Sequence, residues 1–159
     1  MSVTISLPRS IVEYVRKKAR ELGMSIEEYL TELLIQDLDP HDRAREYIES
    51  AKELLIQAHK ELEEGDLRQA AEKLWGATAL TVKAYAWWKE SRKLSSHGEL
   101  WEYKDKLVEE LGEWVEDSWN AGNSMHICFY EGWCTKKSIE IALKRVEKLI
   151  QEVKAKIRS

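Results

Sequence analysis

The sequence predicts a mainly α protein in two parts: one short strand followed by two helices, and then an antiparallel bundle of four or five helices. Strict alternation of apolar and polar residues occurs only at positions 2–7, whereas apolar residues recur at helical spacing along the rest of the chain. With 2 Pro and 7 Gly in 159 residues, long loops and a β-rich fold are not expected. The 43% of hydrophobic residues is typical of a chain with a sizeable core.

The N-terminal strand is predicted by a period of two that ends at Pro8, which cannot donate to a strand ladder. A lone strand leaves its backbone groups without partners, and the same strand of a second copy is the simplest source of them. The pattern therefore predicts a homodimer that pairs through this segment. The apolar face consists of Val3, Ile5 and Leu7, and the polar face of Ser2, Thr4 and Ser6.

Two helices follow the strand. The first has an apolar stripe that ends at Leu22, and Gly23 is a typical C-terminal stop. The second begins at Ser25, which forms a capping box with Glu28, and its stripe runs to residue 38. An Asp–Pro pair at residues 39–40 is a typical helix start, so we place one module at residues 1–38 and the bundle at residues 40–159.

The bundle is predicted from long apolar stripes separated by short breaks. The helix at residues 67–90 is apolar around most of its girth, as a central helix should be. Ser96 and Thr135 are expected caps of later helices, and a further helix is expected at residues 113–133. All seven Trp lie between residues 75 and 133, which fits either a core of large side chains or an aromatic-lined pocket.

Charge and cysteine content exclude several classes of protein. The net charge of −4 argues against a surface coated for nucleic acid, although residues 1–24 are net basic and residues 25–40 carry only acidic charges. Cys128 and Cys134 are too few for a disulfide scaffold or a zinc site, so we expect reduced thiols and no metal. No apolar run or signal segment suggests a membrane protein, and we expect a cytoplasmic one. Abundant Glu, Lys and Arg resemble a thermophile's composition.

The order of strand, helix, Gly turn and Ser-capped helix over residues 3–34 resembles the ribbon-helix-helix family of DNA-binding proteins. The resemblance implies an obligate dimer whose outward strand side chains enter the major groove. Ser and Thr discriminate bases poorly, so a module used only for dimerisation stays an alternative. The positions that the resemblance and the helix start assign to DNA are Ser2, Thr4, Ser6, Arg9, Met24 and Ser25.

The bundle resembles the archaeal PaREP family, which is similar to HEPN (higher eukaryotes and prokaryotes nucleotide-binding) domains, through residues 70–80, 83–86, 94–97 and 126–133. HEPN ribonucleases use an Arg and a His separated by four to six residues, the Arg to stabilise phosphate charge and the His to move a proton. Here His126 is present, but Asn120 stands in place of the Arg. We therefore assign no catalytic residue and do not expect an enzyme.

Three interpretations of His126 stay open: a buried structural histidine, part of a small-ligand or nucleotide site, and a hydrolytic residue. The function predicted is that of a non-enzymatic, transcription-regulator-like DNA-binding homodimer with a ligand-sensing or interaction bundle and no cofactor. The alternative is a HEPN-like nucleotide- or RNA-binding protein, dimerised by its N-terminal module. The predicted pocket contains Asn120, Asn123, His126, Tyr130, Glu131, Lys83 and His97.

Overall fold

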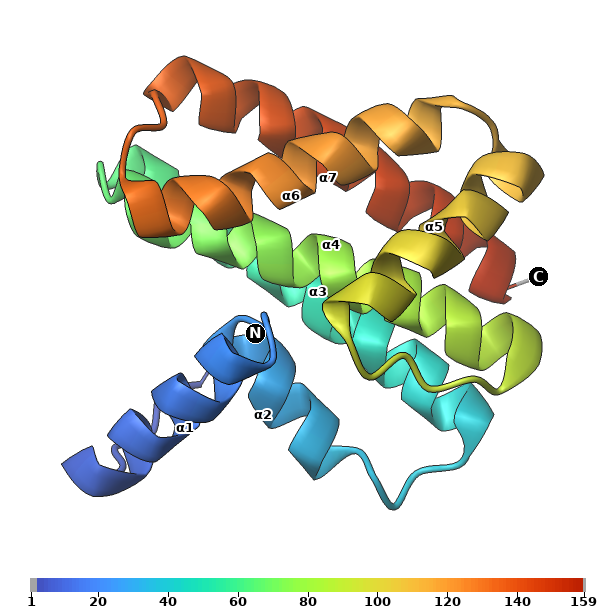
Figure 1. The fold of residues 1–159 in the computed structure, drawn as a ribbon, viewed down its shortest axis with the longest axis horizontal. Coiled ribbons are helices and arrows are strands. Elements are labelled where there is room, and N and C mark those ends of the chain that lie inside the picture. Colours follow the sequence, from blue (N-terminus) through green and yellow to red (C-terminus); the bar gives the residue numbers. More distant parts are fainter. Residues whose placement is uncertain (1–2, 159) are drawn as a thin grey trace.

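The computed structural model describes residues 3–158, in which all regular secondary structure is helical (Figure 1). This confirms the predicted mainly α fold. None of the helices in this range is both long and apolar enough to cross a bilayer. The helices are α1 (Arg9–Glu21), α2 (Ile26–Leu34), α3 (Pro40–Glu63), α4 (Leu67–Glu90), α5 (His97–Leu111), α6 (Trp114–Glu131) and α7 (Lys136–Arg158).

The helices α3, α4, α6 and α7 run up and down in an antiparallel bundle, while α5 crosses one end of it (Figure 1). The central element is α4, which packs against α3, α6 and α7 and is buried around most of its circumference. Trp75, Trp87 and Trp119 are buried, whereas Trp133 is 59% exposed. Some of the tryptophan side chains therefore lie in the core, whereas Trp133 lies at the surface.

The predicted helix starts are confirmed by side-chain caps. Ser25, Asp39, Ser96 and Thr135 each accept a hydrogen bond from the backbone N–H three residues further on, at 2.9 to 3.1 Å. Such caps satisfy N–H groups that have no partner inside the helix. The start of α3 at Pro40 thus lies where the sequence predicts it, whereas α2 already ends at Leu34.

The predicted N-terminal strand is not present in this single chain. Residues 3–8 have no regular secondary structure, and the side chains of Val3 and Ile5 are 83% and 73% exposed. The physical reason is that a strand needs a second strand for its backbone groups, and one chain supplies none. Ser2, assigned to the same face as Thr4 and Ser6, lies outside the described residues.

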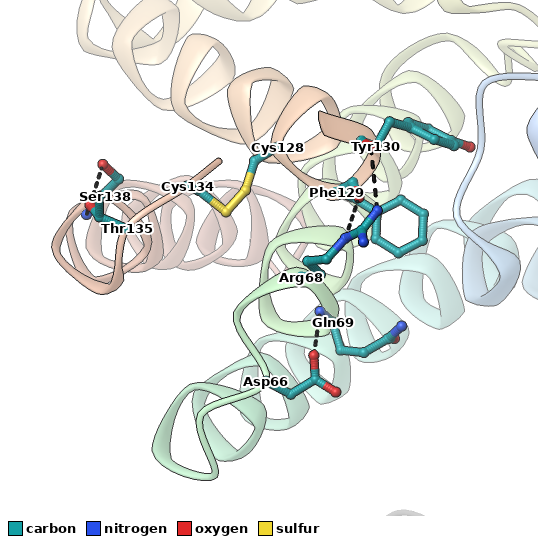
Figure 2. Close-up of a disulfide and its surroundings, with 9 residues drawn as sticks. All are labelled: Asp66, Arg68, Gln69, Cys128, Phe129, Tyr130, Cys134, Thr135 and Ser138. Carbon is teal, nitrogen blue, oxygen red and sulfur yellow. Dashed lines mark hydrogen bonds between the residues drawn. A yellow bond between two sulfur atoms is a disulfide. The ribbon is translucent and has the colours of Figure 1, made fainter. Parts of the chain in front are cut away.

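The prediction of reduced cysteines is wrong. Cys128 and Cys134 form a disulfide, with their Cα atoms 5.3 Å apart, and the described residues contain no free cysteine (Figure 2). The sequence predicts a helix that continues to residue 133, and on such a helix side chains six residues apart point to different faces. Instead α6 ends at Glu131, and Gly132, at a φ of 73°, turns the chain back toward Cys128.

Candidate functional site

A groove of about 350 Å³ lies where the N-terminal helices α1 and α2 meet the bundle helices α4 and α6. Figure 1 shows α1 and α2 on one side of the bundle, with α1 projecting away from it. The groove is thus built from segments that are far apart in the sequence. Its lining consists of Arg16, Ala19, Arg20, Met24, Ser25, Ile26, Glu27, Gln69, Glu72, Phe129 and Tyr130.

The α1 side of the groove is cationic. Arg16 and Arg20 are one helical turn apart and both are exposed. The Arg20 guanidinium lies 5.7 Å from the centre of the Tyr130 ring, which suits a cation–π contact. Among residues 3–158, no carboxylate is within ion-pair distance of either guanidinium. Both positive charges are therefore available to an anion in the groove.

The first turn of α2 forms a second part of the groove. Ser25 accepts a hydrogen bond from the N–H of Glu28, and Met24 and Ser25 are only 7% and 2% exposed. They are buried because α2 packs closely on α4, where a Cβ added to Gly76 would lie 2.6 Å from Ser25 Oγ. The structure thus places Met24 and Ser25 at the junction with the bundle.

The other residues that the sequence assigns to DNA are placed differently. Thr4, Ser6 and Arg9 are exposed, and Arg9 begins α1. None of the three lines the groove. The predicted set is therefore divided between an exposed N-terminal segment and a buried helix junction.

The bundle side of the groove contains an acid–histidine pair. Glu72 Oε2 on α4 lies 3.3 Å from His126 Nδ1 on α6, and the two side chains are only 9% and 14% exposed. Burial raises the pKa of Glu72 above its ordinary value, and the hydrogen bond from His126 opposes this shift. His126 therefore has a polar partner, which fits both a structural histidine and a residue of a ligand site. Glu72 also borders the groove, so the pair lies at a ligand-accessible edge.

Aromatic rings surround this pair. The Trp75 ring lies 5.2 Å from the His126 ring and 5.3 Å from the His97 ring, measured between centroids. His97 Nε2 accepts a hydrogen bond from Trp101 Nε1 at 2.9 Å, which requires a neutral imidazole. Burial lowers the pKa of His97, and the nearby His126 adds to that shift. The predicted pocket residues His97, His126 and Tyr130 are thus brought together.

The C-terminal end of α6 is fixed by two constraints. Arg68 Nε donates to the carbonyl of Phe129 at 2.9 Å, and Arg68 Nη2 donates to that of Tyr130 at 3.3 Å. The Cys128–Cys134 disulfide holds the same end from the other side, and Tyr130 extends away from it (Figure 2). The two aromatic residues that line the groove therefore lie on an anchored support.

The remaining predicted pocket residues do not join this cluster. Asn120 and Glu131 are exposed, Asn123 is half-buried, and no hydrogen bond or ring contact joins any of them to His126. Lys83 is eleven residues beyond Glu72 on α4, about 16 Å along the helix axis at 1.5 Å per residue. The structure therefore brings together three of the predicted pocket residues and places the other four elsewhere.

Lys83 instead forms a buried ion cluster between α4 and α2. Its Nζ lies 2.6 Å from a carboxylate oxygen of Glu28 and 2.6 Å from one of Glu32. Tyr47 on α3 donates its O–H to the same Glu32 oxygen at 2.9 Å. Burial alone would lower the pKa of Lys83, but the two carboxylates outweigh it and raise the pKa. Burial raises the pKa of Glu28 despite the attraction of Lys83.

Sequence reasoning assigned no site role to several polar residues that line the groove from outside α6: Arg16, Arg20, Glu27, Gln69 and Glu72. One signal was present, because Glu72 and Lys83 are charged residues within the most apolar helix of the chain, eleven residues and so three turns apart on one face. That face is the one on which α2 packs. The arginines of α1 carried no such signal, since exposed basic residues are common.

The described residues contain no group of three or more His, Cys, Asp or Glu side chains arranged to hold a metal ion. The groove lining itself offers groups for hydrogen bonding, charge pairing and ring stacking. Fold and groove together define a helical-bundle protein with a docked N-terminal helix pair and an open groove at the junction.

The chain belongs to the archaeal PaREP1/PaREP8 family, whose family model matches residues 46–150, about two thirds of the chain. The match covers the bundle from within α3 to within α7 and begins after the N-terminal helix pair. Searches of curated proteins and of solved structures found no match to the chain.

Proposed function

We propose that the protein is a non-enzymatic, DNA-binding homodimer of the transcription-regulator class. Two copies pair through residues 3–8 in a ribbon-helix-helix arrangement, and the bundle acts as a ligand-sensing or interaction unit. The observation that carries this proposal is the alternating apolar set Val3, Ile5 and Leu7, which is 83%, 73% and 44% exposed in the single chain. Exposed apolar residues that recur on one face of a segment are typical of an interaction surface.

The helix pair supports the same interpretation. In a ribbon-helix-helix dimer, the helices of the two copies pack on each other, so each chain alone leaves apolar helix surface uncovered. Several large apolar side chains of α1 and α2 are exposed to solvent here. They are Ile11, Tyr14, Leu22, Leu33 and Leu34.

The DNA-facing residues in this proposal are Thr4 and Ser6 on the polar face of the segment, with Arg9 at the start of α1. All three are exposed. Hydroxyl groups can donate or accept at base edges but discriminate weakly, whereas an arginine contacts phosphate regardless of sequence. We therefore expect weak, salt-sensitive binding with modest sequence preference.

Dimerisation is tested by Ile5→Lys, with Thr4→Lys as the matched control on the opposite face. Ile5→Lys should yield monomers in sedimentation velocity, because it buries an unpaired charge at the shared apolar face. Thr4→Lys should stay dimeric. A wild-type monomer, or an Ile5→Lys variant that sediments as the wild-type dimer, would overturn this part of the proposal.

DNA binding is tested by fluorescence anisotropy with a pool of random duplexes at 50 and 200 mM salt. For about four to six phosphate contacts per dimer, affinity should fall by about 10²–10³ between these conditions. Arg9→Gln should weaken all duplexes about equally. A wild-type dimer that binds no duplex at low salt would favour a module used only for dimerisation.

A second candidate function is a HEPN-like nucleotide- or RNA-binding protein dimerised by its N-terminal module. It is favoured by the His126–Glu72 pair, which borders a groove lined by Arg16 and Arg20. Anisotropy with single-stranded RNA separates the two candidates. Tighter binding to RNA than to duplex DNA at equal salt would favour the second.

A further inference from the structure

We propose that the groove between α1, α2, α4 and α6 binds a small ligand that joins a planar, hydrogen-bond-donating ring to an anionic group, the chemistry of a nucleoside monophosphate. This proposal rests on the ligand-sensing role proposed above for the bundle. It assigns that role to a site shared by the bundle and the N-terminal helices, and to a class of ligand.

The anionic group is expected at the α1 side. Arg16 and Arg20 line the groove from adjacent turns of α1, and neither is neutralised by a carboxylate within residues 3–158. Guanidinium groups match the geometry of phosphate and carboxylate oxygens. Ile26 and Glu27, in the first turn of α2, line the same groove, and the first N–H groups of a helix have no acceptor within it. The two arginines and the first turn of α2 therefore border the same space.

The ring is expected against Phe129 and Tyr130. Both line the groove from the end of α6, and their carbonyls are held by Arg68 while the disulfide holds Cys128 beside them (Figure 2). An aromatic surface fixed before binding costs little conformational entropy when a ring stacks on it. This is the feature that favours a planar group over an aliphatic one.

The α4 side favours a ring that donates hydrogen bonds. Gln69 and Glu72 line the groove there, and Glu72 keeps one of its oxygens on His126. The carboxylates of Glu72 and Glu27 give the groove a second, acidic side, without pairing with either arginine. A simple polyanion would be repelled by them, whereas a ligand with amino groups at one end and an acidic group at the other matches both sides.

The volume of about 350 Å³ falls at the lower end of the range of about 300–1,000 Å³ that is usual for small-molecule sites. A ligand of this size would contact the N-terminal helices and the bundle at once. Its binding would thus favour one placement of α1 and α2 relative to α4 and α6. This gives the sensing role a physical basis, because a ligand shifts an equilibrium only by differential contact with its states.

The experiment is titration calorimetry on the full chain, without DNA, with the four ribonucleoside 5′-monophosphates, their nucleosides and inorganic phosphate. At least one monophosphate should bind, and more tightly than both its nucleoside and phosphate. Arg16→Gln and Arg20→Gln should each weaken it by about tenfold or more, as expected for loss of one charge-assisted contact. Lys17→Gln, an exposed neutralisation on the same helix outside the groove, should leave the affinity unchanged.

Failure to bind any of the four monophosphates would overturn the proposal, as would an equal loss in Lys17→Gln. Phosphate binding as tightly as the monophosphates would also overturn it, because the ring would then contribute nothing. Since the titration contains no DNA, its outcome is independent of the duplex assay. A wild type that binds a monophosphate but no duplex keeps this site and removes the DNA-binding proposal, and the reverse result does the opposite.

Discussion

Lys83 and Glu28 form an ion pair that is closed to solvent: Nζ and Oε2 are 2.6 Å apart, and the two side chains are 1% and 0% exposed. The pair joins α4, the centre of the bundle, to α2 of the N-terminal helix pair. Glu32 shares the same ammonium group, so two carboxylates depend on one cation. The Oε1 atom of Glu28 has no hydrogen-bond partner in the described structure. The negative charges of Glu28 and Glu32 are therefore balanced by Lys83 alone within this cluster.

Lys83→Met should be strongly destabilising. Removing the cation leaves two buried carboxylates without a partner, and breaking a buried pair in this way costs about 3–5 kcal/mol. The free energy of unfolding, measured by urea denaturation at pH 7, checks this. Lys89→Met, an exposed change on the same helix, should cost far less. Equal losses in the two variants would contradict the role assigned to the cluster.

The cost of Lys83→Met should depend on pH. Burial raises the pKa of Glu28 above the ordinary value of 4.5, and loss of Lys83 raises it further. Because the folded state then holds this proton more tightly than the unfolded state, stability is highest in acid and falls as pH rises from 4.5 through the folded pKa. The difference between variant and wild type should therefore be smaller at pH 4 than at pH 7. A constant difference would show that charge burial is not the cause.

Gly76→Ala should loosen the contact between α2 and α4. The new Cβ would lie 2.6 Å from Ser25 Oγ and 3.1 Å from Leu54 Cδ1, so α2 or its cap must shift. Overpacking of this kind typically costs about 1–3 kcal/mol. Gly98→Ala, where the nearest atom is 3.8 Å away, is the control and should have little effect. Thermal melts followed by circular dichroism compare the two variants.

The disulfide should stabilise the folded state by about 2 kcal/mol, because closing its short loop removes entropy from the unfolded chain. The melting temperature should fall when a reductant is added to the wild type. The double variant Cys128→Ser and Cys134→Ser should melt at the lower temperature and ignore the reductant. Free thiols detected in the oxidised, denatured wild type would contradict the pairing.

His126→Ala should destabilise the fold rather than abolish an RNA-cleaving activity. It removes the partner of Glu72 and a ring packed on Trp75, and loss of a buried hydrogen bond with its packing costs about 1–3 kcal/mol. Incubation of wild type and variant with mixed RNA should show no cleavage by either protein. Cleavage by the wild type alone would instead assign a catalytic role to His126, with Arg20, which lies over the neighbouring Tyr130 ring, as a candidate cation.

The helices could be predicted from the sequence because their signals are local. Four helices begin at caps whose partners lie three residues further on: Ser25, Asp39, Ser96 and Thr135. Apolar residues around most of its circumference identify α4 as the central helix. Such features depend on short stretches of backbone geometry. They predict where helices begin and which face is buried, but not which helices meet.

The groove could not be predicted in full because it is formed by contacts between segments that are far apart in the sequence. His97, His126 and Tyr130, which the sequence assigned to one pocket, do lie near one another. Lys83 was placed in the same pocket, yet its partners come from α2, about fifty residues earlier in the chain. The disulfide was missed for a related reason, since one glycine at residue 132 ends the helix that its prediction assumed.

The placement of Glu28 has a consequence for the evolution of this architecture. Its side chain is fully enclosed only while α2 rests on α4, and its counter-charge belongs to the other part of the chain. Residues 1–38 grafted onto an unrelated protein would present Glu28 on the packing face of α2 without its counter-charge. The N-terminal helix pair and the bundle are therefore matched to each other. A functional chimaera would need to keep Lys83 together with the helix pair.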